Sequence, residues 1–183
     1  MPANVLVHRA VIHARAAADA AQHWFEFAAQ QTRTAVVHQN HMEVFGAVEI
    51  ADPGPGEILV RHKAIGLNYQ DVYQRSGFYP LPLPSGVGTE AAGVVEKVGP
   101  DVRDVKAGDR VAYAGGAVGA YADVRVVPAV RVVKLPDGVS EEQAAGMMLK
   151  AMTVEYLLNR CYPLKTGEHA LFYAASGGVG LFA

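Results

Sequence analysis

The sequence predicts an α+β protein, in which a strand-rich, partly barrel-like domain precedes one further strand and a glycine-rich turn. From residue 34 onward, short apolar stretches alternate with glycine and proline turns, a spacing typical of small β-barrels. Near the end of the chain, an apolar run at residues 171–173 leads into Gly177, Gly178 and Gly180. A buried strand followed by such glycines is typical of a turn that receives the phosphates of a nucleotide.

The composition excludes several classes of partner. The chain has 183 residues, of which 51% are hydrophobic, and this suits one globular domain with a sizeable core. The net charge of −2 provides no basic surface for nucleic acid or anionic lipid. No apolar run approaches the ~18–20 residues that a membrane span needs. We therefore expect neither a nucleic acid nor a membrane as partner.

Residues 1–33 differ from the rest and are expected to form an N-terminal extension. Residues 14–31 are rich in alanine and carry a partly one-sided apolar face, which predicts a helix. Arg9 and Arg15 precede the first acidic residue, so an amphipathic targeting presequence is an alternative. The expected location is cytoplasmic, or organellar if the extension is a presequence.

Strands dominate the expected domain, residues 34–160. They are predicted at residues 34–38, 43–50, 57–65, 89–98 and 111–113. In the third of these, charged Glu57, Arg61 and Lys63 alternate with apolar residues, as expected for an antiparallel strand with one solvent face. Gly115 and Gly116 predict a hairpin-like return through residue 127.

Helices are predicted on either side of the central strands. Residues 69–75 form a short helix, and the alternate prolines that follow predict a stiff, extended loop over residues 77–84. Ser140 and Gln143 have the spacing of a capping box, which opens a helix through about residue 153.

Five motifs then point to a known family. They are NYQDVYQRSGFYP at 68–80, GTEAAGVV at 88–95, AGDRV at 107–111, LKAMT at 149–153 and AASGGVG at 174–180. Over residues 34–183 the chain resembles the NADPH:quinone oxidoreductases, the zeta-crystallin-like branch of the medium-chain dehydrogenase/reductase superfamily. The resemblance implies a GroES-like catalytic domain, followed at residues 161–183 by the start of a Rossmann domain, with NADPH as cofactor. It also implies a quinone or activated enone as substrate and a homodimer for the full-length protein.

The resemblance also implies the site residues. Those expected to contact the cofactor are Asn68, Asp71, Tyr73, Lys150, Thr153, Ser176, Gly177, Gly178, Val179 and Gly180. Asn68, Tyr73 and Tyr79 are the expected catalytic residues. Reduction of a quinone needs a hydride from the nicotinamide and a proton, and Tyr73 or Tyr79 is the expected proton donor.

Two alternatives stay open. One is another zinc-free reductase of the superfamily, such as an enoyl-thioester reductase. The other is a non-enzymatic fragment, or a binding or structural protein of the crystallin kind. The chain stops three residues after Gly180, so we expect an incomplete form that neither binds NADPH tightly nor reduces quinones. The residue that selects NAD or NADP lies ~20 residues beyond the glycines, so NADPH is implied by the resemblance alone.

The first prediction concerns zinc. Zinc-dependent relatives carry a histidine where this chain has Thr89, and the single cysteine, Cys161, cannot supply a structural site of four thiolates. We therefore expect elemental analysis of the purified protein to find no stoichiometric zinc. One zinc ion per chain that survives dialysis against a chelator would contradict this expectation.

Overall fold

The computed structural model describes residues 34–38, 41–45 and 50–183, so the helix and extension expected at residues 1–33 lie outside the described residues. The elements are β1 (Thr34–His38), β2 (His41–Phe45), β3 (Glu57–Ile65), α2 (Tyr69–Arg75), β4 (Ser85–Gly86), β5 (Glu90–Val98), β6 (Arg110–Ala114), β7 (Val124–Pro128), η1 (Ala129–Arg131), β8 (Val132–Lys134), α3 (Glu141–Glu155) and η2 (Tyr156–Cys161). No helix in this described part is long and apolar enough to cross a membrane.

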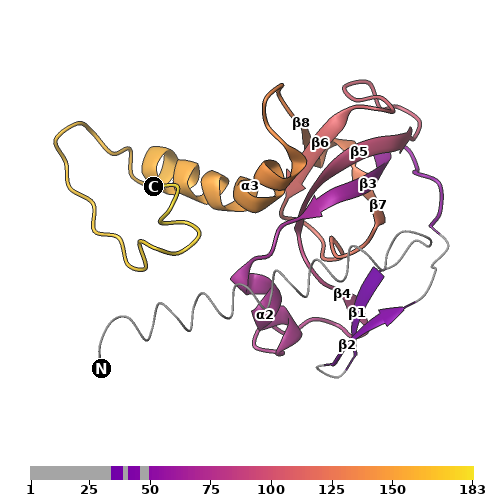
Figure 1. The fold of residues 1–183 in the computed structure, drawn as a ribbon, viewed down its shortest axis with the longest axis horizontal. Helices are drawn as coiled ribbons and strands as arrows, with labels where there is room; N and C mark the ends of the chain where they lie inside the picture. The colour runs from indigo at the N-terminus through magenta and orange to yellow at the C-terminus, as the bar shows by residue number, and fades with distance from the viewer. Residues whose placement is uncertain (1–33, 39–40, 46–49) are drawn as a thin grey trace.

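The strands form two antiparallel sheets (Figure 1). The larger has five strands in the order β7-β3-β5-β6-β8, and the smaller has three in the order β2-β1-β4. Helix α3 leaves the larger sheet at one end, and the C-terminal segment folds back beside it in yellow (Figure 1). Helix α2 follows β3 of the larger sheet and precedes β4 of the smaller one, and it lies on the side of the molecule nearer the smaller sheet (Figure 1).

The two faces of the larger sheet are buried by different partners. One face holds the main apolar cluster, which includes Ile58, Val60, Val95, Val111 and Val127. The other face carries a row of three register partners, Ala64, Ala92 and Ala112, on neighbouring strands.

Two alanines of α3, Ala144 and Ala145, pack on this row. Because an alanine side chain ends at Cβ, the helix backbone lies close to the sheet. The row of alanines therefore sets the distance between α3 and β5.

Locally encoded elements agree with the sequence predictions. Helix α2 and strand β3 have the predicted bounds, and α3 begins after Ser140, whose hydroxyl accepts a hydrogen bond from the Gln143 N–H at 3.2 Å. The Gln143 side chain accepts from the Ser140 N–H in return, at 2.9 Å, which completes the predicted capping box. Of the strand predicted at residues 43–50, the first part lies in β2, which runs from His41 to Phe45, and residues 46–49 lie outside the described residues.

The predicted alternation in β3 is interrupted. Arg61 and Lys63 are exposed as expected, but Ile58, Leu59 and Val60 are all buried. Farther along the strand, the pairing of β3 with β5 skips Lys63, between His62 and Ala64. Such a bulge turns the following side chains to the other face, and Ala64 accordingly packs in a different cluster from Ile58 and Val60.

The predicted hairpin, in which the chain returns beside residues 111–113 through residue 127, is wrong. Strand β7 pairs with β3, with Val124 opposite Arg61, and not with β6. In the described sheet, β6 already has β5 on one edge and β8 on the other. Since both edges of β6 are occupied, β7 adds to the free edge of β3.

The predicted strand at residues 171–173 is also wrong. These residues form no strand, and the side chains of Leu171 and Tyr173 are 81% and 87% exposed. A strand needs a neighbour to satisfy its backbone groups, and none of the described strands lies beside this segment. Residues 171 and 172 have no regular structure, and a series of turns begins at Tyr173.

A half-buried histidine, His62, lies within the larger sheet. Nδ1 of His62 donates to the Ala122 carbonyl at 2.6 Å, and Nε2 accepts from the Tyr113 hydroxyl at 3.0 Å. Burial lowers the pKa of His62 to about 4, the Ala122 hydrogen bond opposes this shift, and the charge of Arg125 adds to it. The imidazole is therefore neutral in the folded protein at pH 7.

This histidine predicts a loss of stability in acid. Between about pH 7 and pH 4 the unfolded chain takes up a proton at His62 and the folded chain does not, so the free energy of unfolding falls as the pH falls. The expected decrease is about 3 kcal/mol, measured by urea unfolding over this range. His62→Gln should flatten the pH dependence, whereas the matched change His169→Gln, at an exposed position, should leave it unchanged. Equal slopes in the wild type and His62→Gln would contradict the assignment.

Candidate active site

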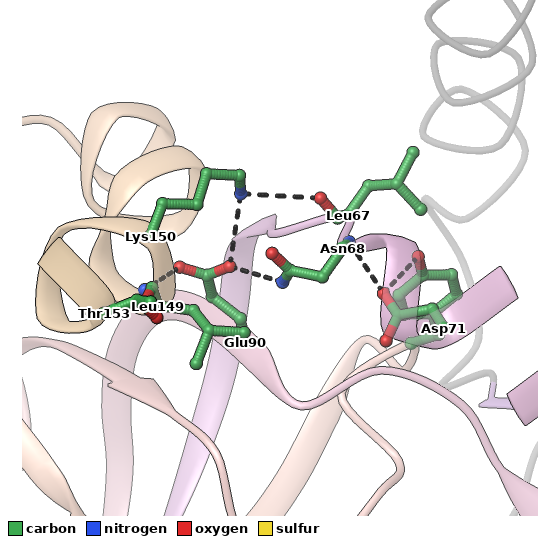
Figure 2. Close-up of polar contacts among 8 residues, drawn as sticks. Leu67, Asn68, Asp71, Glu90, Leu149, Lys150 and Thr153 are labelled. Atoms are coloured by element: carbon green, nitrogen blue, oxygen red, sulfur yellow. Dashed lines mark hydrogen bonds and ion pairs between the residues drawn. The ribbon is translucent and has the colours of Figure 1, made fainter. Parts of the chain in front are cut away.

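Three segments of the chain meet at one buried carboxylate. Glu90, the first residue of β5, has no solvent exposure. Its Oε2 accepts a hydrogen bond from Asn68 Nδ2 at 2.6 Å, and its Oε1 accepts one from the backbone N–H of Leu149 at 2.7 Å. The ammonium of Lys150 lies 3.7 Å from Oε2. Figure 2 shows these donors converging on Glu90 from the start of α2 and from α3.

Asn68 has two structural tasks at the start of α2. It is the N-cap residue, with extended backbone angles, and its N–H donates to Asp71 Oδ2 at 3.0 Å. The Nδ2 group of its side-chain amide donates a hydrogen bond to Glu90 Oε2. The orientation of this amide is therefore fixed by a partner on another strand.

Asp71 is buried and serves the same turn. Besides the Asn68 N–H, Oδ2 accepts the hydroxyl of Tyr121 at 3.1 Å. Burial raises the pKa of Asp71, and these two hydrogen bonds oppose the shift. Burial raises the pKa of Tyr121, and the adjacent Asp71 adds to that shift. The contacts of Asp71 in the structure hold α2 in place, and its predicted contact with a cofactor stays a prediction.

The two expected catalytic tyrosines belong to an aromatic cluster, which we define as Tyr69, Tyr73, Phe78 and Tyr79. The ring of Tyr73 is central, with centroids 5.1 Å from Tyr69, 5.0 Å from Phe78 and 5.1 Å from Tyr79. The Tyr79 N–H also donates to the Tyr73 carbonyl at 3.0 Å. Tyr79 is 48% exposed, so its ring can meet a molecule from solvent.

Lys150 and Thr153 lie on neighbouring turns of α3. Lys150 Nζ lies 3.5 Å from the Leu67 carbonyl, and only 19% of its side chain is exposed. The Thr153 hydroxyl donates to the Leu149 carbonyl at 2.8 Å, so its proton is used within the helix. Of these two predicted residues, Lys150 is the one whose polar group reaches the Glu90 carboxylate.

The glycine turn lies against the same lysine. A Cβ placed on Gly178 would lie 2.9 Å from Lys150 Cδ, so a larger residue there would displace the lysine. The turn is closed by hydrogen bonds from the Gly177 N–H to Ala174 and from the Leu181 N–H to Gly177. The structure thus brings Gly178, Lys150 and Asn68 into one connected group. No hydrogen bond, ion pair or ring contact in the described residues joins Tyr73 or Tyr79 to it.

Glu90 is the site residue that the sequence analysis missed. Its signal was present, because it is the one charged residue in the apolar and small-residue run from Thr89 to Val95. Charged residues are rarely fully buried without partners. Among the described residues, no group of three histidine, cysteine, aspartate or glutamate side chains could hold a metal ion.

Comparison with known proteins identifies the fold and its relatives. Residues 54–137 match the alcohol dehydrogenase GroES-like domain. The chain is 58% identical over 134 residues to a quinone oxidoreductase of Pseudomonas aeruginosa, covering 73% of this chain and 41% of that protein. It is 56% identical over 144 residues to quinone oxidoreductase 1 of Escherichia coli, covering 77% and 44%.

A solved structure agrees with these sequences. The Escherichia coli quinone oxidoreductase complexed with NADPH has a TM-score of 0.78 and 50% identity, over 82% of this chain and 47% of that one. The chain therefore spans less than half the length of these relatives. The GroES-like α+β fold predicted from the motifs is confirmed. Over the part that these relatives match, the chain is similar in sequence and in fold to the quinone oxidoreductases, in agreement with the family resemblance of its five motifs.

Proposed function

We propose that the protein containing this chain is an NADPH-dependent reductase of quinones or related activated enones. The observation that carries the proposal is the position of Lys150, which lies against Gly178 on one side and beside Glu90 and Asn68 on the other. The turn that is expected to receive the phosphates is therefore connected, through Lys150, to Asn68, another residue expected to contact the cofactor. The relatives named quinone oxidoreductases, one of them solved with NADPH, support the same assignment.

The residues present suit this cofactor. Gly178 lacks a Cβ at the point of contact with Lys150, and a lysine ammonium is a compact positive charge that attracts phosphate. The oriented amide of Asn68 offers a hydrogen-bonding group whose direction Glu90 holds. We propose that Asp71, Thr153, Ser176, Gly177, Val179 and Gly180 complete the contacts, as the family resemblance implies.

When bound, NADPH supplies a hydride. The hydride and one proton together convert a quinone into a hydroquinone, and in this proposal the proton comes from the hydroxyl of Tyr73 or Tyr79. The exposed rings of the aromatic cluster provide flat apolar faces against which a planar quinone can stack. The contacts of Tyr73 with three neighbouring rings hold it in one orientation.

We also propose the domain division and the setting of the complete protein. Residues 34–160 would form the catalytic domain, and residues 161–183 would begin the NADPH-binding Rossmann domain. By resemblance to the family, the complete protein would act as a cytoplasmic homodimer.

The second candidate substrate class, enoyl thioesters, uses the same hydride chemistry. The complete protein should therefore be assayed with NADPH against a simple benzoquinone and against an enoyl thioester. Quinone-dependent oxidation of NADPH supports the proposal, and oxidation with the thioester alone would replace it. If neither substrate is reduced, the non-enzymatic alternative is favoured.

The site residues give a sharper prediction. In the complete protein, Asn68→Ala and Tyr79→Phe should each lower kcat/KM for the quinone by at least about tenfold. Tyr79→Phe should leave Tm nearly unchanged, whereas Asn68→Ala should also lower Tm, because it removes a hydrogen bond to the buried Glu90. Loss of one transition-state hydrogen bond typically lowers kcat by ~10²–10³.

Tyr69→Phe is the matched control for Tyr79→Phe. Tyr69 belongs to the same aromatic cluster and is 72% exposed, but it has no proposed catalytic role. Equal losses from Tyr69→Phe and Tyr79→Phe would count against the role of Tyr79. A fall in the Tm of Tyr79→Phe that parallels its fall in activity would make Tyr79 a structural residue.

A further inference from the structure

We propose that Glu90 is a positioning residue of the active site, which holds Asn68 and Lys150 in the arrangement that receives the cofactor. The inference rests on the proposed function, since it assigns a role within the same site. Glu90 has no exposed surface and so touches neither cofactor nor substrate. Any influence it has on the reaction must pass through the residues it contacts.

The partners of Glu90 are all hydrogen-bond donors. They are an amide N–H of Asn68, the backbone N–H of Leu149 and the ammonium of Lys150. An ionised carboxylate is an acceptor only, and it matches such a set. Moving a carboxylate out of water is costly unless it is paired, so this geometry is strongly preferred over one in which any donor is withdrawn.

The contact with Leu149 is unusual because this residue lies inside α3. A helical N–H ordinarily donates to the carbonyl four residues earlier, which here is Ala145. Glu90 Oε1 lies 2.7 Å from the Leu149 nitrogen, so the carboxylate is inserted against the helix backbone. The position of α3, and with it the position of Lys150, is thereby tied to β5.

Gly66 closes the opposite side of this group. A Cβ on Gly66 would lie 2.2 Å from the Ala145 carbonyl oxygen and 2.5 Å from Glu90 Oε2. The segment that precedes Asn68 therefore packs directly on both the helix and the carboxylate. On this side Glu90 has no free space, so its carboxylate cannot turn toward Gly66.

The conservative substitution Glu90→Gln removes the charge of the side chain and keeps its shape, so it tests the positioning role with little change in packing. Glutamine has the same shape, and its Oε1 can still accept from Leu149. Its Nε2 would face the Asn68 amide donor, so one of the two amides must turn, and Lys150 would lose its anionic partner. The control is Glu96→Gln, the same change on the same strand at a surface residue paired with Arg61.

The first readout requires no turnover. Titration of the complete protein with NADPH, followed by fluorescence, should show a dissociation constant about tenfold higher for Glu90→Gln, and no change for Glu96→Gln. Asn68→Ala should also weaken binding. The double variant Asn68→Ala with Glu90→Gln should then lose less than the product of the two single losses, because Glu90 acts in part through Asn68.

If the losses of NADPH affinity in the two single variants multiply in the double variant, and if they parallel a fall in Tm, Glu90 has a merely structural role and the proposal is overturned. Equal dissociation constants for the wild type and Glu90→Gln would also overturn it. Should Glu90→Gln fail to fold, Glu90→Asp keeps the charge and shortens the side chain. It should likewise raise the dissociation constant, and an unchanged value would overturn the proposal.

A second readout is independent of NADPH. The side-chain amide protons of Asn68, observed by NMR in the free protein, should exchange slowly in the wild type and in Glu96→Gln, and shift and exchange faster in Glu90→Gln. If this change occurs in a protein that reduces no quinone, the positioning contact stands and the proposed function fails. An Asn68 amide that is unaffected by Glu90→Gln overturns the inference, even in an active enzyme.

Discussion

The arrangement of the site depends on the burial of one carboxylate. Glu90 lies at the point where β5 begins, and its two oxygens are satisfied from α3 and from the turn that begins α2. Since an unpaired buried charge is strongly unfavourable, these three segments cannot move apart independently. A polar contact in the interior thus couples elements that are distant in sequence, and Asn68 and Lys150 take their positions from it.

The apolar packing makes this polar contact possible. The row of Ala64, Ala92 and Ala112 on the sheet lets the alanines of α3 approach closely. A larger side chain in the row would move the helix outward and lengthen the hydrogen bond between Leu149 and Glu90. The alanine side chains form no hydrogen bonds, but they set the distance between α3 and the Glu90 carboxylate.

Local sequence patterns were sufficient for part of the candidate site. Asn68 and Asp71 stand at the N-cap and third positions of α2, and the predicted helix has the observed bounds. The aromatic residues that follow are close in sequence, so their contacts with one another depend on a few intervening dihedral angles. Glu90 was missed because its partners lie 22 and 59 residues away. No local spacing encodes such contacts.

The sequence by itself determined the elements whose hydrogen bonds close within a few residues. The capping box of Ser140 and Gln143 begins α3 as predicted, because both of its bonds join residues three apart. Tertiary structure alone decided the place of β7 beside β3 and the absence of a strand at residues 171–173. A strand exists only where another strand's free edge is available to it, and which edges are free depends on how the whole sheet is assembled.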